Sequence, residues 1–600
     1  MKKLLAIALT LAGICFACTG TPGGAQSRSF SATEQGFGGE VAVTLTIKGN
    51  KLVDVTIEGP GETPNVGQLA FAPLADRMIK GNSVEVDGVT GATFTSTAVI
   101  RAAKSALAAS GVTLAAVRGG GTGGELRTFT TDVVVVGGGL AGLTAAISAA
   151  DNGAKVIVLE KLPTTGGNAQ SSLGSFMVAQ VPENREYHVA AEPDTLDAAV
   201  ARWKSYQDDF SYDKSSPYPD YGRLRYMLTQ TMLTLKWLTT HGATFEAKSP
   251  IAERGMAMLQ GNAPAETVTS TPSAANLLAH LRKVVEHEQG STILLETPAT
   301  DLIMDGNKVI GVRATSPEGP VEVYAKSVIL ACGSYTQNPD MVRELMPDIG
   351  ELHPQAVISD TGDGIKMAQR QGAVLWGHDF IHPVPPTPSK EFLSVVPQAT
   401  SIGIANHILM DKNGNRFLNE GVVSNLYAKI ELRMAELKAG PYWQLISPAN
   451  ENETTVSRLE TGLASGGVLK ADTLDELAAK AGIAPAALRA TVTRYNQSAA
   501  SGTDAEFGKA RANLIAYPAT GPFYLMRTIL SACDVLGGIK TDQDYKVLKA
   551  DNSWIQNLWA AGSVSNKQYY NQYYFSGSSL SFATVSGKLT GAQAAANALN

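Results

Sequence analysis

The sequence contains little cysteine for its length of 600 residues, with four in all. Cys15 and Cys18 lie in an apolar N-terminal segment, which leaves Cys332 and Cys533 for the remaining chain. Two cysteines cannot form the disulfide framework that stabilises many small secreted proteins. No Cys-x-x-Cys-His motif occurs, which excludes a covalently attached c-type haem on this chain.

Charged residues are also sparse. They make up 17% of the chain, against 44% hydrophobic residues, and the net charge is −6. No run of basic residues appears, so nucleic acid is not an expected partner. The histidines offer no metal site, because the pair His378 and His382 stands in a loop beside Pro383 and not on a helix. No metal ion is therefore expected.

A hydrophobic run long enough to span a bilayer is absent too, because the apolar segment at residues 4–14 is too short. It follows two lysines and precedes small residues, which is typical of an export signal. We therefore expect a signal peptide over residues 1–18 and a flexible spacer over 19–29. Cys18 with its Gly/Thr-rich spacer resembles a bacterial lipoprotein start, which implies a lipid anchor at the cell surface. A soluble exported protein in the periplasm is the alternative.

Glycine, by contrast, is abundant, with 59 residues. The run Arg-Gly-Gly-Gly-Thr-Gly-Gly at 118–124 marks a domain boundary, and we expect a linker over 118–128. A six-residue Gly/Thr segment reaches about 12–15 Å as a flexible coil. Before the linker, alternating apolar residues predict a β-hairpin over 41–57. Two helices are expected to follow, one over 69–79 and one over 97–109. Residues 30–117 are therefore expected to form a small α+β domain.

Beyond the linker, an apolar run at 133–136 is typical of a buried parallel strand. Gly137, Gly139 and Gly142 form a G-x-G-x-x-G pattern between that strand and a helix, and Glu160 ends the next strand. The glycines allow a pyrophosphate to approach the positive end of the helix, and the acid can accept ribose hydroxyls. The segment predicts a dinucleotide site; a tight strand–helix turn without ligand is the alternative.

Four further glycine segments follow in the same order as in a known family: Thr165-Gly166-Gly167-Asn168, Ala331-Cys332-Gly333, Thr361-Gly362-Asp363-Gly364 and Ala560-Ala561-Gly562. Together they resemble the fumarate reductase flavoprotein family, which includes fumarate and urocanate reductases and 3-ketosteroid dehydrogenases. The resemblance covers residues 129–600. It implies an α/β FAD-binding Rossmann-like fold with an inserted α+β cap domain. The FAD-binding domain would comprise 129–380 and 527–600, and the cap 381–526.

The resemblance also implies a set of residues, mostly glycines, that hold FAD non-covalently. They are Gly137, Gly139, Gly142, Glu160, Gly166, Gly167, Asn168, Gly333, Asp363, Gly562, Ser579 and Leu580.

The small N-terminal α+β domain carries a second flavin motif. Residues 87–95 read Asp-Gly-Val-Thr-Gly-Ala-Thr-Phe-Thr. They resemble the acceptor sequence of the FMN-binding domains that are fused to such reductases and occur in sodium-pumping electron-transfer complexes. The resemblance implies that a flavin transferase attaches FMN covalently to Thr95 through a phosphoester. A polar turn that caps the following helix is the alternative.

The substrate site departs from the family. His382-Pro383 and the Arg416 to Glu420 segment match fumarate reductases. At the positions of the family's acid–base relay, this chain has Thr400, Gly403 and Ser424. Cys533-Asp534 stands in place of the family's substrate-binding histidine, and the tyrosines of 569–574 stand in place of its carboxylate-clamping arginine. A dicarboxylate requires charge-assisted arginine contacts, so these departures argue against fumarate.

Tyrosine offers other chemistry in that loop. Tyr573 with Gly577 resembles the hydroxyl and N–H pair with which 3-ketosteroid dehydrogenases polarise a ketone. A tyrosine hydroxyl can also pass a proton to the carbon beside a carbonyl. The resemblance therefore implies catalytic roles for Tyr573, Tyr574, His382, Gly577 and Ser424. Aromatic packing is the alternative for the tyrosines, and a structural ion pair is the alternative to substrate binding for Arg416.

These features predict an exported two-flavin ene-reductase. A membrane or periplasmic donor would reduce FMN, and electrons would pass through FAD, as hydride, to the C=C bond of an α,β-unsaturated carbonyl compound in anaerobic respiration. An enone or an unsaturated monocarboxylate is expected. A ketosteroid-type dehydrogenase that runs the reverse reaction is one alternative. A surface electron-transfer flavolipoprotein without its own substrate is another, although an intact cap argues against it.

Overall fold

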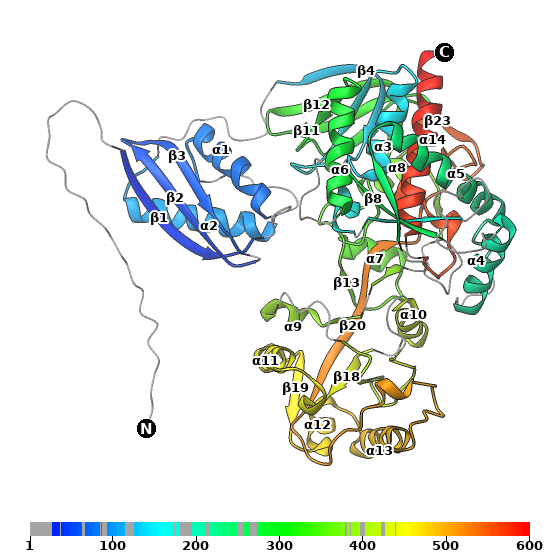
Figure 1. The fold of residues 1–600 in the computed structure, drawn as a ribbon. Coiled ribbons are helices and arrows are strands. Elements are labelled where there is room, and N and C mark those ends of the chain that lie inside the picture. The colour runs from blue at the N-terminus through cyan, green and yellow to red at the C-terminus, as the bar shows by residue number, and fades with distance from the viewer. Residues whose placement is uncertain are drawn as a thin grey trace. The chain divides into compact units, whose positions relative to one another are not determined.

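The computed structural model describes residues 27–600 except for positions 37, 63–66, 85, 87–92, 115–124, 173, 180–194, 211–215, 249–256, 264–272, 378–380, 385, 397–402, 422–426, 439 and 576. The chain divides into two compact units, one of residues 1–88 and 94–120 and one of residues 89–93 and 121–600. Figure 1 shows their elements. The expected signal peptide lies outside the described residues. Within the described ones, no helix has the length and apolar character needed to cross a bilayer.

The first unit is a three-stranded antiparallel sheet with two helices. β1 (Ser27–Gln35), β2 (Glu40–Lys48) and β3 (Lys51–Glu58) pair in that order, and α1 (Phe71–Gly81) and α2 (Thr93–Ser110) follow. Every second residue of β2 is buried, because side chains alternate between the two faces of a strand. The predicted hairpin is confirmed by the pairing of β2 with β3.

Two boundaries in this unit differ from the sequence-based expectation. β1 begins at Ser27, inside the segment 19–29 that was expected to be a flexible spacer. The strand is polar in sequence, and it is held by pairing with β2 along its whole length. α2 begins at Thr93, before the expected start at 97, so that Thr95 lies in the first helical turn.

The second unit is built on an eight-stranded sheet, and the predicted parallel pairing of strand 133–136 with the next strand is confirmed. The path of the sheet is β10-β11-β23-β12-β4-β5-β9, with β22 paired to β23. The strands are β4 (Arg127–Val136), β5 (Val156–Leu159), β9 (Thr292–Leu294), β10 (Ala299–Asp305), β11 (Lys308–Ser316), β12 (Gly319–Leu330), β22 (Lys546–Leu548) and β23 (Trp554–Ala560).

α3 (Leu140–Asp151) and α14 (Ser578–Leu599) pack against this sheet and against each other. Their backbones meet directly. A Cβ at Gly587 would lie 2.3 Å from the Ala141 carbonyl oxygen, and one at Gly591 would lie 2.3 Å from the Ala145 carbonyl oxygen. Only glycine allows this approach. The close contact fixes the N-termini of both helices at the same end of the sheet, where the site lies.

The remaining elements of the FAD-binding part surround this core. A small sheet has the order β6-β8-β7, and β14 pairs with β21. These elements are β6 (Ser175–Val178), α4 (Leu196–Phe210), α5 (Tyr221–Thr240), β7 (Thr244–Lys248), β8 (Ala257–Asn262), α6 (Ser273–Lys283), α7 (Pro339–Leu345), β13 (Leu352–Pro354), α8 (Asp363–Arg370), β14 (Leu375–Trp376) and β21 (Gly538–Ile539).

The segment expected to form the cap, residues 381–526, is called the cap below. It shares one long strand, β20 (Phe523–Val535), with the residues that follow, so β20 crosses the expected boundary at 526 (Figure 1). β20 pairs with most strands of the cap sheet and also with β13 of the FAD-binding part. The other elements are β15 (Ile381–Pro383), β16 (Thr387–Pro388), α9 (Lys390–Val395), β17 (Ile408–Met410), α10 (Tyr427–Leu437), β18 (Tyr442–Ile446), α11 (Glu453–Gly462), β19 (Val468–Ala471), α12 (Leu474–Ala481) and α13 (Pro485–Ser501).

A buried ion cluster stabilises one side of the cap. The Arg416 guanidinium lies 2.8 Å from both the Glu420 and the Asp504 carboxylates, and the Lys509 ammonium lies 3.4 Å from Glu420. All four side chains are almost fully buried. Both ion-pair partners of Arg416 are residues of the cap itself, which agrees with the structural alternative for this residue.

Candidate functional site

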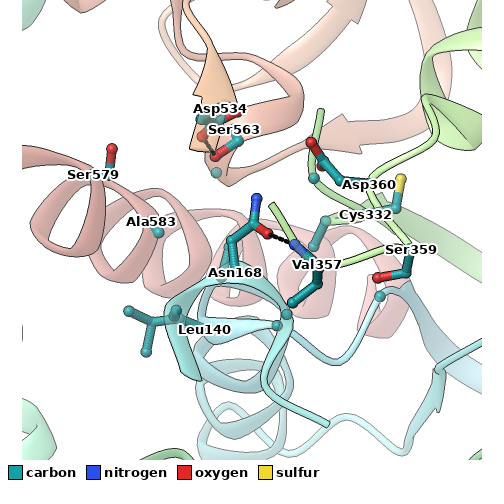
Figure 2. A pocket seen from close by; sticks show the side chains of 18 of the residues that line it. Leu140, Asn168, Cys332, Val357, Ser359, Asp360, Asp534, Ser563, Ser579 and Ala583 are labelled. Atoms are coloured by element: carbon teal, nitrogen blue, oxygen red, sulfur yellow. Dashed lines mark hydrogen bonds between the residues drawn. The ribbon is translucent and has the colours of Figure 1, made fainter. Parts of the chain in front are cut away.

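A cavity of about 800 Å³ lies at the carboxyl ends of the central parallel strands (Figure 2). Open α/β sheets bind ligands at this edge. Most of the predicted cofactor residues line it. These are Gly137, Gly139, Glu160, Gly166, Gly167, Asn168, Gly333, Asp363, Gly562, Ser579 and Leu580.

The first wall is the turn between β4 and α3. Gly137 has φ +106°, and a Cβ there would lie 2.5 Å from the Ala331 carbonyl oxygen. Gly139 is the N-cap of α3, which begins without a side-chain cap. Gly142 does not line the cavity. A Cβ at Gly142 would lie 1.8 Å from the Gly137 carbonyl oxygen, so this glycine lets the helix pack beneath the turn.

Glu160 fixes the shape of this turn. Its two carboxylate oxygens accept hydrogen bonds of 2.8 Å from the backbone N–H groups of Gly138 and Leu162. The side chain is buried, and desolvation raises the pKa of Glu160. Glu160 therefore holds the turn between β4 and α3. It also lines the cavity, where its remaining lone pairs can accept a hydrogen bond from a ligand hydroxyl.

Asn168 joins three segments of the cavity wall. Its Nδ2 donates to the Cys533 carbonyl oxygen over 3.0 Å. Its Oδ1 accepts from the Val357 N–H over 2.7 Å (Figure 2). The preceding Gly166 donates its N–H to the Gly138 carbonyl oxygen over 2.9 Å. The amide of Asn168 thus positions β20 against the dinucleotide turn.

These observations fit FAD. A cavity of this size is within the range of about 300–1,000 Å³ for small-molecule sites. The turn at Gly137 leads into the N-terminus of α3, where the N-cap Gly139 has no side chain between the first helical N–H groups and the cavity. Such close backbone approach is what a pyrophosphate at a helix N-terminus requires.

In the first unit, the Thr95 hydroxyl donates a hydrogen bond of 2.7 Å to Glu62 Oε2. Thr95 and Glu62 are 2% and 1% exposed. The hydroxyl thus donates to a carboxylate from another segment. A residue that merely caps the helix would instead accept a hydrogen bond from a backbone N–H of the first turn. Residues 87–92 of the acceptor motif lie outside the described residues. A hydroxyl in the first turn of an 18-residue helix fits attachment of a phosphate group.

On the substrate side, His382 stacks on Tyr574 with ring centroids 3.3 Å apart. His382 Nδ1 lies 3.3 Å from Cys533 Sγ. Desolvation lowers the pKa of His382 to about 3 and raises the pKa of Tyr574 to about 12, so both rings are neutral near pH 7. Gly577, the N-cap of α14, lines the same cavity.

Tyr573 is a correction to the sequence-based prediction. It does not line this cavity but is fully buried among aromatic rings, 5.6 Å from Tyr206 and 5.1 Å from Phe575 between centroids. Gln207 Nε2 donates to the Tyr573 carbonyl oxygen over 2.6 Å and fixes this orientation. Tyr574, and not Tyr573, therefore stands beside Gly577 on the wall.

Three other predicted positions give less information. Ser424 lies outside the described residues, as does Thr400. Gly403 lies in the cap, where its carbonyl oxygen accepts a hydrogen bond of 3.0 Å from Gln444. Within the described residues, no group of three or more His, Cys, Asp or Glu side chains could hold a metal ion.

A pair of buried carboxylates on the cavity wall was not predicted (Figure 2). Asp360 accepts hydrogen bonds from the Ser334 N–H and hydroxyl, and Asp534 accepts from the Val535 N–H and the Ser563 hydroxyl. Desolvation, followed by the charge of Asp360, raises the pKa of Asp534 to about 7. The sequence signal was the acid at the family's histidine position, but nothing local pointed to Asp360.

Comparison with known proteins agrees with this site. Residues 132–580 match the model of the FAD binding domain family, and residues 36–108 match that of the FMN-binding domain. The chain belongs to the fumarate reductase-like flavoproteins. The FAD- and FMN-binding domains expected for this flavoprotein are thereby confirmed.

Several relatives of this flavoprotein are known. It is 27% identical to the urocanate reductase of Eggerthella lenta, over 96% of this chain and 93% of that protein. It is 28% identical to the NADH:fumarate oxidoreductase of Klebsiella pneumoniae and 26% identical to the NADH:acrylate oxidoreductase of Vibrio harveyi, over 95% and 90% of this chain. The chain spans 58% of the length of each of the latter two.

Solved structures share the fold of the second unit. The open conformation of a flavocytochrome c3 fumarate reductase matches 79% of each chain with a TM-score of 0.58 and 25% identity. A 3-ketosteroid Δ1-dehydrogenase from Sterolibacterium denitrificans matches 78% of this chain and 99% of that one with a TM-score of 0.61 and 19% identity, which shows the fold alone.

Proposed function

We propose that this flavoprotein is an exported two-flavin ene-reductase of anaerobic respiration, whose substrate is an α,β-unsaturated carbonyl compound less anionic than fumarate. The observation that carries the substrate proposal is the composition of the cavity wall on the substrate side, next to His382 and Tyr574. His382, Cys533, Asp534, Tyr574 and Gly577 line this side, and none of them is a Lys or Arg; the one Lys or Arg among the described residues of the whole wall is Lys161.

Lys161 is not available to a substrate carboxylate. Its ammonium lies 2.6 Å from Asp363 Oδ2 and 2.6 Å from the Thr361 hydroxyl. Leaving a buried charge without a partner costs several kcal/mol. A dicarboxylate would therefore bind poorly on the substrate side of the cavity, because its two charges would lack a cationic partner there. A ketone or a monocarboxylate would lose less hydration free energy.

Tyr574 and Gly577 supply the neutral chemistry that such a substrate needs. The Tyr574 phenol keeps its proton at neutral pH, because burial raises its pKa to about 12. It can therefore donate a hydrogen bond to a substrate carbonyl or protonate the neighbouring carbon. The neutral imidazole of His382 stacks on the phenol ring and holds its plane. Together these groups would orient the carbonyl without requiring an anion.

When bound, FMN on Thr95 would take electrons from a membrane or periplasmic donor, and FAD would deliver them as hydride to the substrate carbon. The chain's own contribution is to hold the dinucleotide against the glycine turns. The names of two relatives refer to acrylate and urocanate, which are both unsaturated monocarboxylates, and this supports the proposed substrate class.

The test uses holoprotein co-expressed with a flavin transferase and reduced with a viologen dye. Dye oxidation is followed with fumarate, acrylate, urocanate, cinnamate and a steroid enone. We expect kcat/KM for one monocarboxylate or enone to exceed that for fumarate at least tenfold. Fumarate as the fastest substrate would overturn the proposal. Bleaching of the oxidised flavin by a saturated ketosteroid would favour the dehydrogenase, and no response to any compound would favour a pure electron carrier.

A further inference from the structure

The buried pair of Thr95 and Glu62 in the first unit has a chemistry that flavin binding alone does not use. One carboxylate oxygen of Glu62 accepts the Thr95 hydroxyl over 2.7 Å, and the other accepts the Gly38 N–H over 3.1 Å. Both partners are neutral, and the carboxylate is 1% exposed. Burying a carboxylate is unfavourable, so its place beside this particular hydroxyl calls for an explanation.

Glycine backbones close around the pair and hold it in place. A Cβ at Gly36 would lie 2.1 Å from Glu62 Oε1, and a Cβ at Gly67 would lie 2.4 Å from Glu62 Oε2. The same Cβ at Gly67 would lie 2.9 Å from the Thr95 hydroxyl. The carboxylate is therefore confined to the side of the hydroxyl, and any side chain at these two positions would displace it.

We propose that Glu62 is the general base for covalent attachment of FMN to Thr95. A threonine hydroxyl is a weak nucleophile, and a base within about 2.6–3.2 Å is needed to take its proton as it attacks. Glu62 meets this distance without rearrangement. The first turn of α2, in which Thr95 lies, presents N–H groups that favour the incoming phosphate.

The reaction is a phosphoryl-group transfer from a flavin adenine dinucleotide supplied with the flavin transferase. Thr95 Oγ1 forms a bond to the flavin-side phosphorus, the bond from that phosphorus to the bridging oxygen breaks, and AMP leaves. The hydroxyl proton passes to the Glu62 carboxylate and then to solvent. No group is oxidised or reduced. This inference rests on the proposed covalent FMN at Thr95.

A purely structural hydrogen bond would behave differently on substitution. In Glu62→Gln the amide oxygen can still accept the Thr95 hydroxyl, but it cannot take the proton. In Glu62→Asp a carboxylate is retained at a greater distance. Glu58→Gln is a matched control, because Glu58 is exposed and lies in the same unit. General-base catalysis contributes about 10²–10⁴-fold to a rate.

The experiment incubates the full-length apoprotein with flavin transferase and FAD and follows attachment by intact mass and by fluorescence in denaturing gels. Rates are divided by the folded fraction from circular dichroism. We expect Glu62→Gln to be at least 100-fold slower than wild type, Glu62→Asp intermediate and Glu58→Gln unchanged. A Gln rate equal to or above the Asp rate would overturn the inference.

Two further arms separate this inference from the proposed attachment site. Thr95→Val should carry no flavin, and Thr95→Ser should be labelled. If wild type is not labelled, or if Thr95→Val is labelled, the covalent site itself is wrong and the inference falls with it. If those two arms behave as expected but Glu62→Gln is labelled at the wild-type rate, only the role of Glu62 is wrong.

Discussion

His382 stacks on Tyr574 at 3.3 Å between ring centroids, which joins the entrance of the cap to the C-terminal loop. His382 belongs to β15, whereas Tyr574 precedes α14 by a few residues. The contact places Tyr574, and not the adjacent Tyr573, on the cavity wall.

Replacing each of the two tyrosines by phenylalanine tests this assignment. Tyr574→Phe removes the hydroxyl of a residue that lines the cavity. We expect kcat to fall by about 10²–10⁴-fold, as for loss of a proton donor. Tyr573→Phe keeps the buried ring packing and should leave kcat within about twofold of wild type. Both are measured with the viologen dye assay on flavin-matched protein. Equal losses in the two variants would contradict the assignment.

Asp534 should make stability depend on pH. Its pKa in the folded protein is about 7, raised from 3.8, so the native state binds more protons than the unfolded state between these values. Stability from this group is therefore greatest below about pH 4 and is lost as pH rises to about 7. A shift of this size corresponds to a loss on the order of 4 kcal/mol.

The measurement compares urea unfolding of wild type and Asp534→Asn at several pH values. Carboxylates away from this pair contribute equally to both proteins, so the difference between the two curves reports on Asp534 together with the neighbouring Asp360. We expect the amide variant to gain relative stability as pH rises through this window. Parallel curves would show that Asp534 is not perturbed.

Gly142→Ala should weaken FAD binding. The added Cβ would lie 1.8 Å from the Gly137 carbonyl oxygen, so that the helix and the turn must separate. Gly403→Ala is the matched control, because a Cβ there meets nothing within 4 Å. We expect at least tenfold weaker FAD binding for the first variant and none of this effect for the second, measured by flavin absorbance after dialysis. Full retention in Gly142→Ala would refute the role given to this glycine.

Arg416→Ala should lower the free energy of unfolding and leave kcat and KM unchanged. Removing Arg416 takes away the ion-pair partner of the buried Asp504 and leaves Glu420 with Lys509 alone, and breaking such a buried pair costs about 3–5 kcal/mol. Arg433 forms an exposed pair with Glu436, and its replacement by alanine should cost at most about 1 kcal/mol. Chemical denaturation measures both values. If Arg416→Ala instead raises KM for the substrate with stability unchanged, the residue binds substrate.

Most residues that line the cavity could be predicted from the sequence because their signal is local. Gly137, Gly333 and Gly562 have positive φ values and lie within three residues of the end of a strand. The alternation of β2 and the apolar run of β4 are equally local. These patterns specify the cradle for the dinucleotide without knowledge of the tertiary contacts.

The substrate wall could not be predicted in the same way. Tyr573 and Tyr574 are adjacent and chemically identical, and only the packing of Tyr573 against Tyr206 decides which ring faces the cavity. Asp360 and Asp534 are far apart in the chain and come together through β20. The strand β1 escaped prediction because its own sequence is polar and only pairing with β2 defines it.

β20 and β15 are the two connections between the cap and the FAD-binding part, and they pair with each other, with His382 opposite Asp534. The two connections therefore form one antiparallel ribbon, which carries His382, Cys533 and Asp534. All three residues line the cavity. A change in the angle of this ribbon would therefore move part of the cavity wall with it.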